Sequence, residues 1–370
     1  MRVLVVNPPP DFDPEREPFE VVNVDELEVP HLQNRRFRYN AQQFCGMLKS
    51  WLIRKLMGSS RRRDQRLVYI DALSLLAWNL DNVSALLDQH RILIAPHVSF
   101  PVPDDGRHKN EQDFLRSGTY ISGFLALRSS PAARALIDFW SDRVLEHCMP
   151  ERGIAANDQK WFALIPSMFP HVGILRTPGH NLAYWNVQDR TLSKRRGRWF
   201  LGEHLVRIVH FSGYEPERPT EITRYPNDRS PLADRPDLVP LYESYRKELV
   251  RHGYETLGTF PYGYDTFDNG VAISPLVRRF YGELTKPERF GDPFETAPSR
   301  SFYRWMLASP KGRSARSDSL PPLWKWIYEQ SSELQRFFPD VGGRNRQRFL
   351  LWAREQGTDA LDLPAELAPR

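Results

Sequence analysis

The chain has 370 residues, of which 41% are hydrophobic, 12% aromatic and 26% charged. This composition excludes the disordered, collagen-like and repeat-only classes of protein, and the length predicts one large or two modest domains. The formal net charge of +5 is small, so the overall charge does not by itself indicate nucleic-acid binding.

The two cysteines, Cys45 and Cys148, have no second cysteine or close histidine at metal-binding spacing. This argues against a zinc ribbon, a redox pair and a secreted disulfide framework. The apolar run over residues 3–6 is too short for a signal peptide, and no stretch approaches the roughly 20 apolar residues of a membrane span. We therefore expect a soluble protein of the reducing cytoplasm.

Two stretches are rich in basic residues: residues 61–63 with Arg66, and residues 194–198. Such runs suit phosphate groups, nucleic acid or an anionic membrane surface, although most are simply solvated. No recognition helix, RNP or zinc-finger pattern accompanies them. We expect no specific nucleic-acid binding, and peripheral contact with an anionic membrane surface stays open.

Short β-branched runs alternate with stretches of helical spacing in the first 215 residues. Helices are expected over residues 41–57 and 131–148, where apolar side chains recur on one face. Strands are expected over residues 2–7, 66–71, 91–96, 120–128, 172–176 and 205–211. This alternation predicts an α/β sheet.

The composition changes after about residue 216, where proline, arginine and aspartate become frequent. From there the spacing is mostly helical, with helices expected over residues 238–252, 273–284, 301–307 and 323–338. We therefore expect an α/β domain over residues 1–225 and a helical C-terminal domain over residues 226–370.

Four polar residues lie where predicted strands or helices end or begin. Asp71 ends a strand, and ligands of open α/β sheets gather at the C-terminal ends of strands, although an aspartate there can equally form a turn. His210 ends the last strand and suits a divalent metal as a neutral imidazole, unless it is a structural histidine. Asp158 and Gln159 open a helix, where the alternative is an N-cap.

The loop over residues 178–186 reads PGHNLAYWN. Aromatic faces can bury the apolar faces of sugar rings, and amides can bond their hydroxyl groups, so Asn181, Tyr184 and Trp185 suit a sugar-binding loop. A core loop with satisfied amides is the alternative interpretation.

Seven segments in a fixed order carry a family resemblance. They are YIDAL at 69–73, APH at 95–97, PDDGR at 103–107, GTYISGF at 118–124, DQKW at 158–161, PGHNLAYWN at 178–186 and HFSG at 210–213. In order and relative position they resemble bacterial relatives of the family 8 retaining glycosyltransferases, which have the GT-A fold. The resemblance covers about residues 1–215, and FDNGV at 267–271 resembles the tail that this bacterial group carries.

The resemblance implies a GT-A-like fold, a Rossmann-like mixed sheet flanked by helices, followed by a helical domain. It implies that Asp71 and His210 hold Mn²⁺ or Mg²⁺ against the diphosphate of a nucleotide-sugar donor. Asp158 and Gln159 would lie beside the anomeric carbon. Asn181, Tyr184 and Trp185 would shape the pocket for the donor sugar or the acceptor.

The chain departs from the family pattern in three ways. Leu73 stands where the family has a second carboxylate, Ile121 stands where it has an asparagine, and the usual first strand–helix unit, which cradles the nucleotide base, has no counterpart. These departures separate two hypotheses. One is a hexosyltransferase-type glycosyltransferase that moves a sugar from a nucleotide-diphosphate donor to a cell-envelope glycan or small-molecule acceptor. The other is a catalytically silent relative that binds a glycan, a nucleotide sugar or a partner enzyme.

Overall fold

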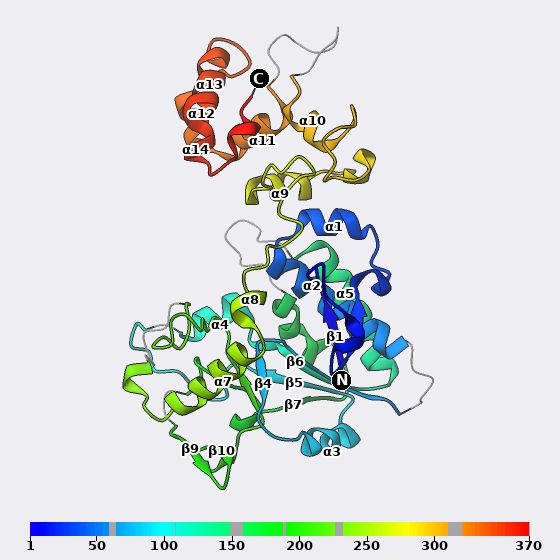
Figure 1. Cartoon of the computed structure of the whole chain (residues 1–370), viewed down its shortest axis with the longest axis vertical. Helices are drawn as coiled ribbons and strands as arrows, with labels where there is room; N and C mark the ends of the chain where they lie inside the picture. Colours follow the sequence, from blue (N-terminus) through cyan, green and yellow to red (C-terminus); the bar gives the residue numbers. More distant parts are fainter. Residues whose placement is uncertain are drawn as a thin grey trace. The chain divides into compact units, whose positions relative to one another are not determined.

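The chain forms two compact units in the computed structural model, which describes residues 1–58, 64–107, 109–148, 158–187, 190–225, 232–309 and 320–369 (Figure 1). The central unit comprises residues 46–260. The terminal unit comprises residues 1–45 together with residues 261–370. This division differs from the boundary near residue 225 that the change in composition indicates.

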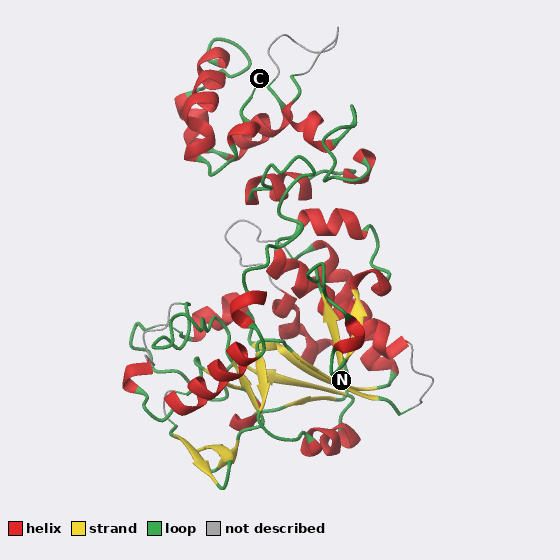
Figure 2. Ribbon diagram, in the orientation of Figure 1, coloured by secondary structure: helices red, strands yellow, loops and turns green. Residues whose placement is uncertain are grey.

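A four-stranded mixed sheet forms the centre of the central unit (Figure 2). Its order is β3, β6, β5, β7, with bounds Arg66–Ile70, Tyr120–Arg128, Ile92–Pro96 and Val172–Ile174. Strand β6 runs antiparallel to both β3 and β5, whereas β7 is parallel to β5. The C-terminal ends of β3, β5 and β7 therefore lie at one edge of the sheet, and the expected α/β class is confirmed.

Strand β6 is interrupted where it faces β5. Ile94 of β5 pairs with Leu125, but the next residue, Ala95, pairs with Ile121. Residues 122–124 of β6 therefore have no partner on β5, although Phe124 still pairs with Ile70 of β3. Irregularities of this kind redirect side chains and are frequent next to functional sites. Ser122 and Gly123 lie in this irregular stretch of β6.

Two smaller sheets complete the strands described in the central unit. In the first, β12 lies between β4 and β8, antiparallel to β4 and parallel to β8. The bounds are Ser74–Leu76 for β4, Leu182–Ala183 for β8 and Ile208–His210 for β12. The second is an antiparallel meander of β9 Leu192–Arg195, β10 Arg198–Leu201 and β11 His204–Leu205.

The helices expected over residues 41–57, 131–148 and 238–252 are present, and Ser130 caps α5 through its side chain. The helices of the central unit are α3 Asp81–Gln89, α4 Glu111–Ser117, α5 Pro131–Glu146, α6 Ile165–Met168, α7 Val239–Arg251 and α8 Tyr254–Leu257, with the 3₁₀ helices η3 Asp158–Leu164, η4 Pro178–His180 and η5 Leu232–Asp234. The shorter ones among them, apart from the helix that Asp158 opens, were not predicted. Helix α2, Ala41–Gly58, supplies the first residues of this unit from Gly46 onward. Val83 and Leu87 of α3 share one buried core with Leu93 of β5 and Phe124 of β6.

The terminal unit is mostly helical. It contains the parallel strands β1 Arg2–Val5 and β2 Glu20–Asn23, followed by α1 Leu32–Arg38. Its later helices are α9 Pro275–Gly282, α10 Phe302–Leu307, α11 Pro322–Gln330, α12 Ser332–Phe337, α13 Arg346–Trp352 and α14 Thr358–Ala360. The unit also contains the 3₁₀ helices η1 Pro14–Arg16, η2 Val24–Leu27, η6 Pro287–Phe290 and η8 Ala365–Leu367, and the π-helix η7 Ala353–Gly357.

Residues 1–45 belong to the terminal unit because their buried groups are held there. Phe37 is fully buried, with its ring centroid 4.7 Å from that of Tyr281. The buried Arg278 donates hydrogen bonds to the carbonyl oxygens of Phe37 and Tyr39, at 2.5 Å and 3.0 Å. The strand expected at residues 2–7 pairs with β2 and not with the four-stranded sheet. Such contacts, distant in sequence, give no signal in local composition.

None of the helices in the described part of the chain is both long enough and apolar enough to cross a membrane.

Candidate functional site

Asp71 lies directly after β3, as its position in the sequence predicts. Its backbone N–H donates to the carbonyl oxygen of Gly123 at 3.0 Å, which ties it to the irregular part of β6. The Tyr69 hydroxyl donates to Oδ1 of Asp71 at 2.6 Å, and Nζ of Lys49 donates to Oδ2 at 3.0 Å. Both carboxylate oxygens are therefore held by side chains.

Lys49, on α2, joins Asp71 to Asp158. Its Nζ lies 3.1 Å from Oδ2 of Asp158 and 3.4 Å from Oγ of Ser122. The Ser122 hydroxyl in turn donates to Oδ2 of Asp158 at 2.6 Å. We call Lys49, Asp71, Ser122 and Asp158 the acidic cluster. With both carboxylates ionised, one ammonium leaves it a net charge of minus one.

The charge of Lys49 is strongly stabilised. Burial lowers its pKa, but the negative charges of Asp158 and Asp71 outweigh burial and hold the pKa of Lys49 well above its ordinary value. The side chain of Lys49 is only 15% exposed, and an ammonium with so little access to water is tolerated only when it is paired and hydrogen-bonded in this way. The lysine therefore stays charged throughout the physiological range of pH.

Asp158 and Gln159 begin the 3₁₀ helix η3. The carbonyl oxygen of Asp158 accepts a hydrogen bond from the indole of Trp140 at 3.0 Å. The amide nitrogen of Gln159 donates to the carbonyl oxygen of Ser117 at 2.7 Å. A Cβ atom on Gly118 would lie 3.0 Å from Cγ of Gln159, and Gly118 has a φ of +113°. The two predicted catalytic residues thus have different surroundings, and Asp158 alone of the pair belongs to the acidic cluster.

His210 ends β12 and is 2% exposed. Its Nδ1 lies 2.8 Å from the hydroxyl of Ser74, while its buried Nε2 has no hydrogen-bond partner within the described residues. Burial lowers the pKa of His210 to about 4; the charge of Asp71 opposes this shift, and that of Lys49 adds to it. The imidazole is therefore neutral at pH 7. The tautomer that donates Nδ1–H to Ser74 leaves the lone pair of Nε2 free.

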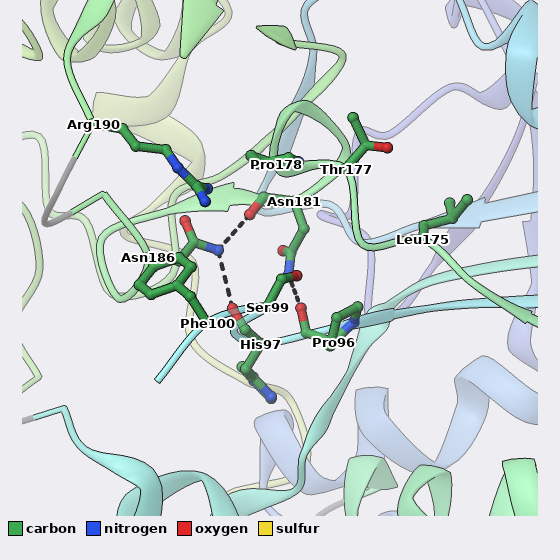
Figure 3. A pocket seen from close by; sticks show the side chains of 10 residues that line it. All are labelled: Pro96, His97, Ser99, Phe100, Leu175, Thr177, Pro178, Asn181, Asn186 and Arg190. Carbon is green, nitrogen blue, oxygen red and sulfur yellow. Dashed lines mark hydrogen bonds between the residues drawn. The ribbon is translucent and has the colours of Figure 1, made fainter. Parts of the chain in front are cut away.

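Asn181, Tyr184 and Trp185 are all buried. Asn181 donates its amide to the carbonyl oxygen of Pro96 at 2.6 Å, and the Trp185 indole donates to the carbonyl oxygen of His97 at 3.1 Å. Asn181 lines a cavity of only about 10 Å³. Figure 3 shows the Asn181 side chain beside those of Pro96 and Asn186. These contacts connect the loop to the end of β5. The rings of Trp185 and His210 are stacked, with their centroids 6.5 Å apart. A role for Asn181, Tyr184 and Trp185 in sugar binding stays a prediction.

The two positions that depart from the family pattern have contrasting environments. Leu73 is 57% exposed in the turn after Asp71. Ile121 is buried in the apolar core of the central unit. A polar side chain is therefore accommodated more easily at position 73 than at position 121.

Two side chains at the site, Asp71 and His210, are of types that can bind a divalent cation, although the described residues form no group of three or more His, Cys, Asp or Glu side chains for one. Asp71 supplies a carboxylate and His210 supplies a neutral, unpartnered nitrogen, oriented from its other side by Ser74. Metal-binding histidines characteristically have such a partner. Oxygen atoms of a diphosphate and of water can complete the coordination of a hard cation.

Sequence reasoning missed Lys49, Tyr69 and Ser122. Tyr69 was detectable, because residues two apart on a strand point to the same side and Tyr69 precedes Asp71 by two. Lys49 lies one helical turn before the buried Ile53, and a lysine on the apolar side of a helix usually has a buried partner. Ser122 gave no local signal, because its contacts depend on the irregular pairing of β6.

The structure describes the second of the two basic stretches, and only Arg66 of the first. Residues 61–63 lie outside the described part of the chain. Residues 194–198 comprise the end of β9, an exposed turn at Arg196 and Gly197, which have positive φ angles, and the start of β10. Arg195 stacks on Phe200, with its guanidinium carbon 4.1 Å from the ring centroid. Contact of this turn with an anionic membrane stays a prediction.

The comparisons with known proteins give two relatives and no function. The chain is 27% identical over 244 residues to a Bacillus subtilis protein known as uncharacterized protein YfnF, covering 63% of this chain and 76% of the relative. It is 23% identical over 250 residues to uncharacterized protein YfnD of the same organism, covering 65% and 75%. No family model matches the chain.

Proposed function

We propose that the chain is a metal-assisted glycosyltransferase that moves a sugar from a nucleotide-diphosphate donor to a cell-envelope glycan or small-molecule acceptor. The observation that carries the proposal is the acidic cluster, in which Lys49 lies 3.0 Å from Asp71 and 3.1 Å from Asp158. The free Nε2 of His210 supports it. The sequence resemblance to family 8 enzymes and the mixed sheet favour a GT-A-like fold for the central unit.

Each residue has a role in this proposal. Asp71 and His210 would hold Mn²⁺ or Mg²⁺, which when bound would act as a Lewis acid for the departing diphosphate. Asp158, oriented by Ser122 and Lys49, would present its carboxylate to the positive charge that develops at the anomeric carbon. Gln159 would contact the sugar or the acceptor from the adjacent turn.

In the proposed transfer, the anomeric carbon of the donor sugar exchanges its bond to the diphosphate for a bond to the acceptor. The acceptor hydroxyl oxygen forms the new bond to this carbon and loses its proton. The bond between the same carbon and the diphosphate oxygen breaks, and the nucleoside diphosphate leaves with the electron pair. The products are the glycosylated acceptor, the nucleoside diphosphate and the proton.

We expect UDP or GDP to bind at least about tenfold more tightly with Mn²⁺ than with EDTA, because the cation would bridge the diphosphate to Asp71 and His210. Titration calorimetry measures both affinities. His210→Gln should remove the effect of Mn²⁺. His180→Gln is the matched control: His180 is also buried, also bonds through one ring nitrogen, to Asn82, and has no role at the proposed metal site. Failure of UDP, GDP and dTDP to bind under either condition would contradict the proposal.

The catalytically silent relative is the second candidate, favoured by Leu73 in place of a carboxylate. Leu73→Asp should therefore strengthen the Mn²⁺-dependent binding of a nucleoside diphosphate about tenfold, since it adds an oxygen ligand two residues from Asp71. Release of nucleoside diphosphate from UDP- and GDP-sugars measures turnover in both proteins. Turnover by the Leu73→Asp variant alone identifies the natural chain as silent, whereas equal turnover means that the second carboxylate is dispensable.

A further inference from the structure

A cavity of about 520 Å³ opens at the edge of the central sheet where β5 and β7 end. Pro96 at the end of β5, Ile174 at the end of β7 and Tyr120 at the start of β6 line it, together with Phe114 and Leu115 of α4. Its volume is within the range of small-molecule sites. None of the candidate site residues described above lines it.

The wall formed by α4 presents an apolar surface. Leu115 is 72% exposed, although it is a large aliphatic side chain next to the buried Phe114. Val98 and Ile174 add further apolar surface to the lining. A ligand with an apolar body would cover Leu115 and remove this surface from water.

The same cavity carries charged and hydroxyl groups. Arg176 is exposed, and its guanidinium makes no ion pair or side-chain hydrogen bond with the residues that the structure describes. Guanidinium groups bind carboxylates and phosphates through paired hydrogen bonds. Glu111 uses Oε1 to accept from the backbone N–H of Val102 at 2.6 Å, so its orientation is fixed. Thr119 and Ser99 add hydroxyl groups.

Two residues that line the cavity directly follow, in sequence, the residues that Gln159 contacts. Gln159 donates to the carbonyl oxygen of Ser117 and packs against Gly118. The next two residues, Thr119 and Tyr120, line the cavity. A ligand in the cavity would therefore contact Thr119 and Tyr120, which directly follow the Ser117–Gly118 segment that Gln159 contacts.

We propose that this cavity is the acceptor site and that it takes an acidic amphiphilic glycoside, with its anionic group on Arg176, its hydroxyl groups toward Glu111 and Thr119, and its apolar part on Leu115. The assignment as an acceptor site rests on the proposed transferase function. The anionic group is a carboxylate, as in a uronic acid, or a phosphate ester.

Three matched probes test the proposal by titration calorimetry: 4-nitrophenyl β-D-glucoside, 4-nitrophenyl β-D-glucuronide and 4-nitrophenyl β-D-glucoside 6-phosphate. They share the sugar and the aromatic group and differ at carbon 6. At least one anionic probe should bind about tenfold more tightly than the neutral glucoside, as expected for one charge-assisted contact. The anionic probe that binds more tightly than the glucoside identifies the anionic group as a carboxylate or a phosphate ester.

Two variants locate the binding. Arg176→Gln should abolish the preference for the anionic probe and leave the affinity for the glucoside unchanged, while Leu115→Asp should weaken all three probes. Arg116→Gln is the matched control, because Arg116 is an exposed arginine of α4 that pairs with Asp113 and does not line the cavity. Equal affinities of the natural chain for all three probes, no binding of any of them, or a preference that survives Arg176→Gln would overturn the proposal.

Titration with UDP and GDP in the presence of Mn²⁺ separates this proposal from the function it rests on. Normal nucleotide binding without probe binding rejects the acceptor site and retains the transferase. Binding of the anionic probe without nucleotide binding retains a ligand site in the cavity and rejects its role as an acceptor site.

Discussion

Lys49→Met is expected to lower the melting temperature by roughly 6–12 °C and to abolish nucleotide binding. The substitution removes the ammonium that contacts both Asp71 and Asp158, and leaves the two carboxylates without this shared partner. Removing one partner from a buried ion pair costs about 3–5 kcal/mol, and we take the lower limit because the side chain of Asp71 is 29% exposed. At roughly 2–4 °C per kcal/mol in a domain of about 150–250 residues, about 3 kcal/mol gives the expected range. Differential scanning calorimetry and titration with UDP and Mn²⁺ measure the two effects.

Two further variants give this experiment its controls. Arg54→Met removes a cation from the same helix, but the pair of Arg54 with Asp138 is exposed, so the melting temperature should change by no more than about 2 °C. The double variant Lys49→Met with Asp158→Asn should recover part of the lost stability, because a single carboxylate remains. A Lys49→Met protein as stable as the natural chain would contradict the electrostatic account of the cluster.

The pH dependence of this effect follows from the raised pKa of Lys49. The charge of Lys49 contributes its full stabilisation of the folded state below the pKa of an unfolded lysine. This stabilisation is lost only as the pH rises through the higher pKa of the folded state. The difference in the free energy of unfolding between the natural chain and Lys49→Met should therefore be constant between pH 7 and pH 9.

A second large effect is expected at acid pH, where the free energy of unfolding should fall steeply between pH 6.5 and pH 4. Burial lowers the pKa of both His97 and His210 from 6.5 to about 4. A lowered histidine pKa favours folding above the unfolded value, and this contribution disappears as the pH falls through the folded value. Each histidine accounts for roughly 3 kcal/mol, so together they approach the whole stability of many domains.

Urea titrations of the metal-free protein at pH 7.5, 6 and 5 measure this dependence. His97→Gln and His210→Gln should each reduce the loss between pH 7.5 and pH 5 by about half, since one of two similar groups no longer titrates. His204→Gln, at an exposed position, is the control. An unchanged loss in both buried-site variants would show that other groups cause the acid sensitivity.

Elements with a strong local pattern could be predicted from the sequence. Strand β6 has the predicted bounds, residues 120–128, because an apolar run lies between turn residues. Helix α2 extends one residue beyond the predicted end. The strands β4 and β8 have three and two residues and exist through pairing with β12. Such short pairings depend on tertiary contacts and have no periodicity to detect.

The candidate site was predictable in part for the same reason. Asp71 and His210 occur at strand ends, so their positions follow from the alternation of strands and helices. The bridge between Asp71 and Asp158 passes through Lys49, which comes from α2 and is distant from both in the sequence. Pairing of charges across separate elements leaves no local signal. The fold must be known before such a cluster can be recognised.

The hydrogen bonds of Lys49 have a consequence for the form in which a donor could enter. An ammonium group has three N–H donors. Nζ of Lys49 has three partners within the cluster, namely Asp71, Asp158 and Ser122, which is one partner for each donor. No proton of Lys49 is left to contact a phosphate oxygen, and the cluster as a whole repels anions. For the proposed transferase, we therefore expect the reactive donor to be the metal chelate of the nucleotide sugar, assembled in solution before it meets the protein, and not the metal-free nucleotide sugar.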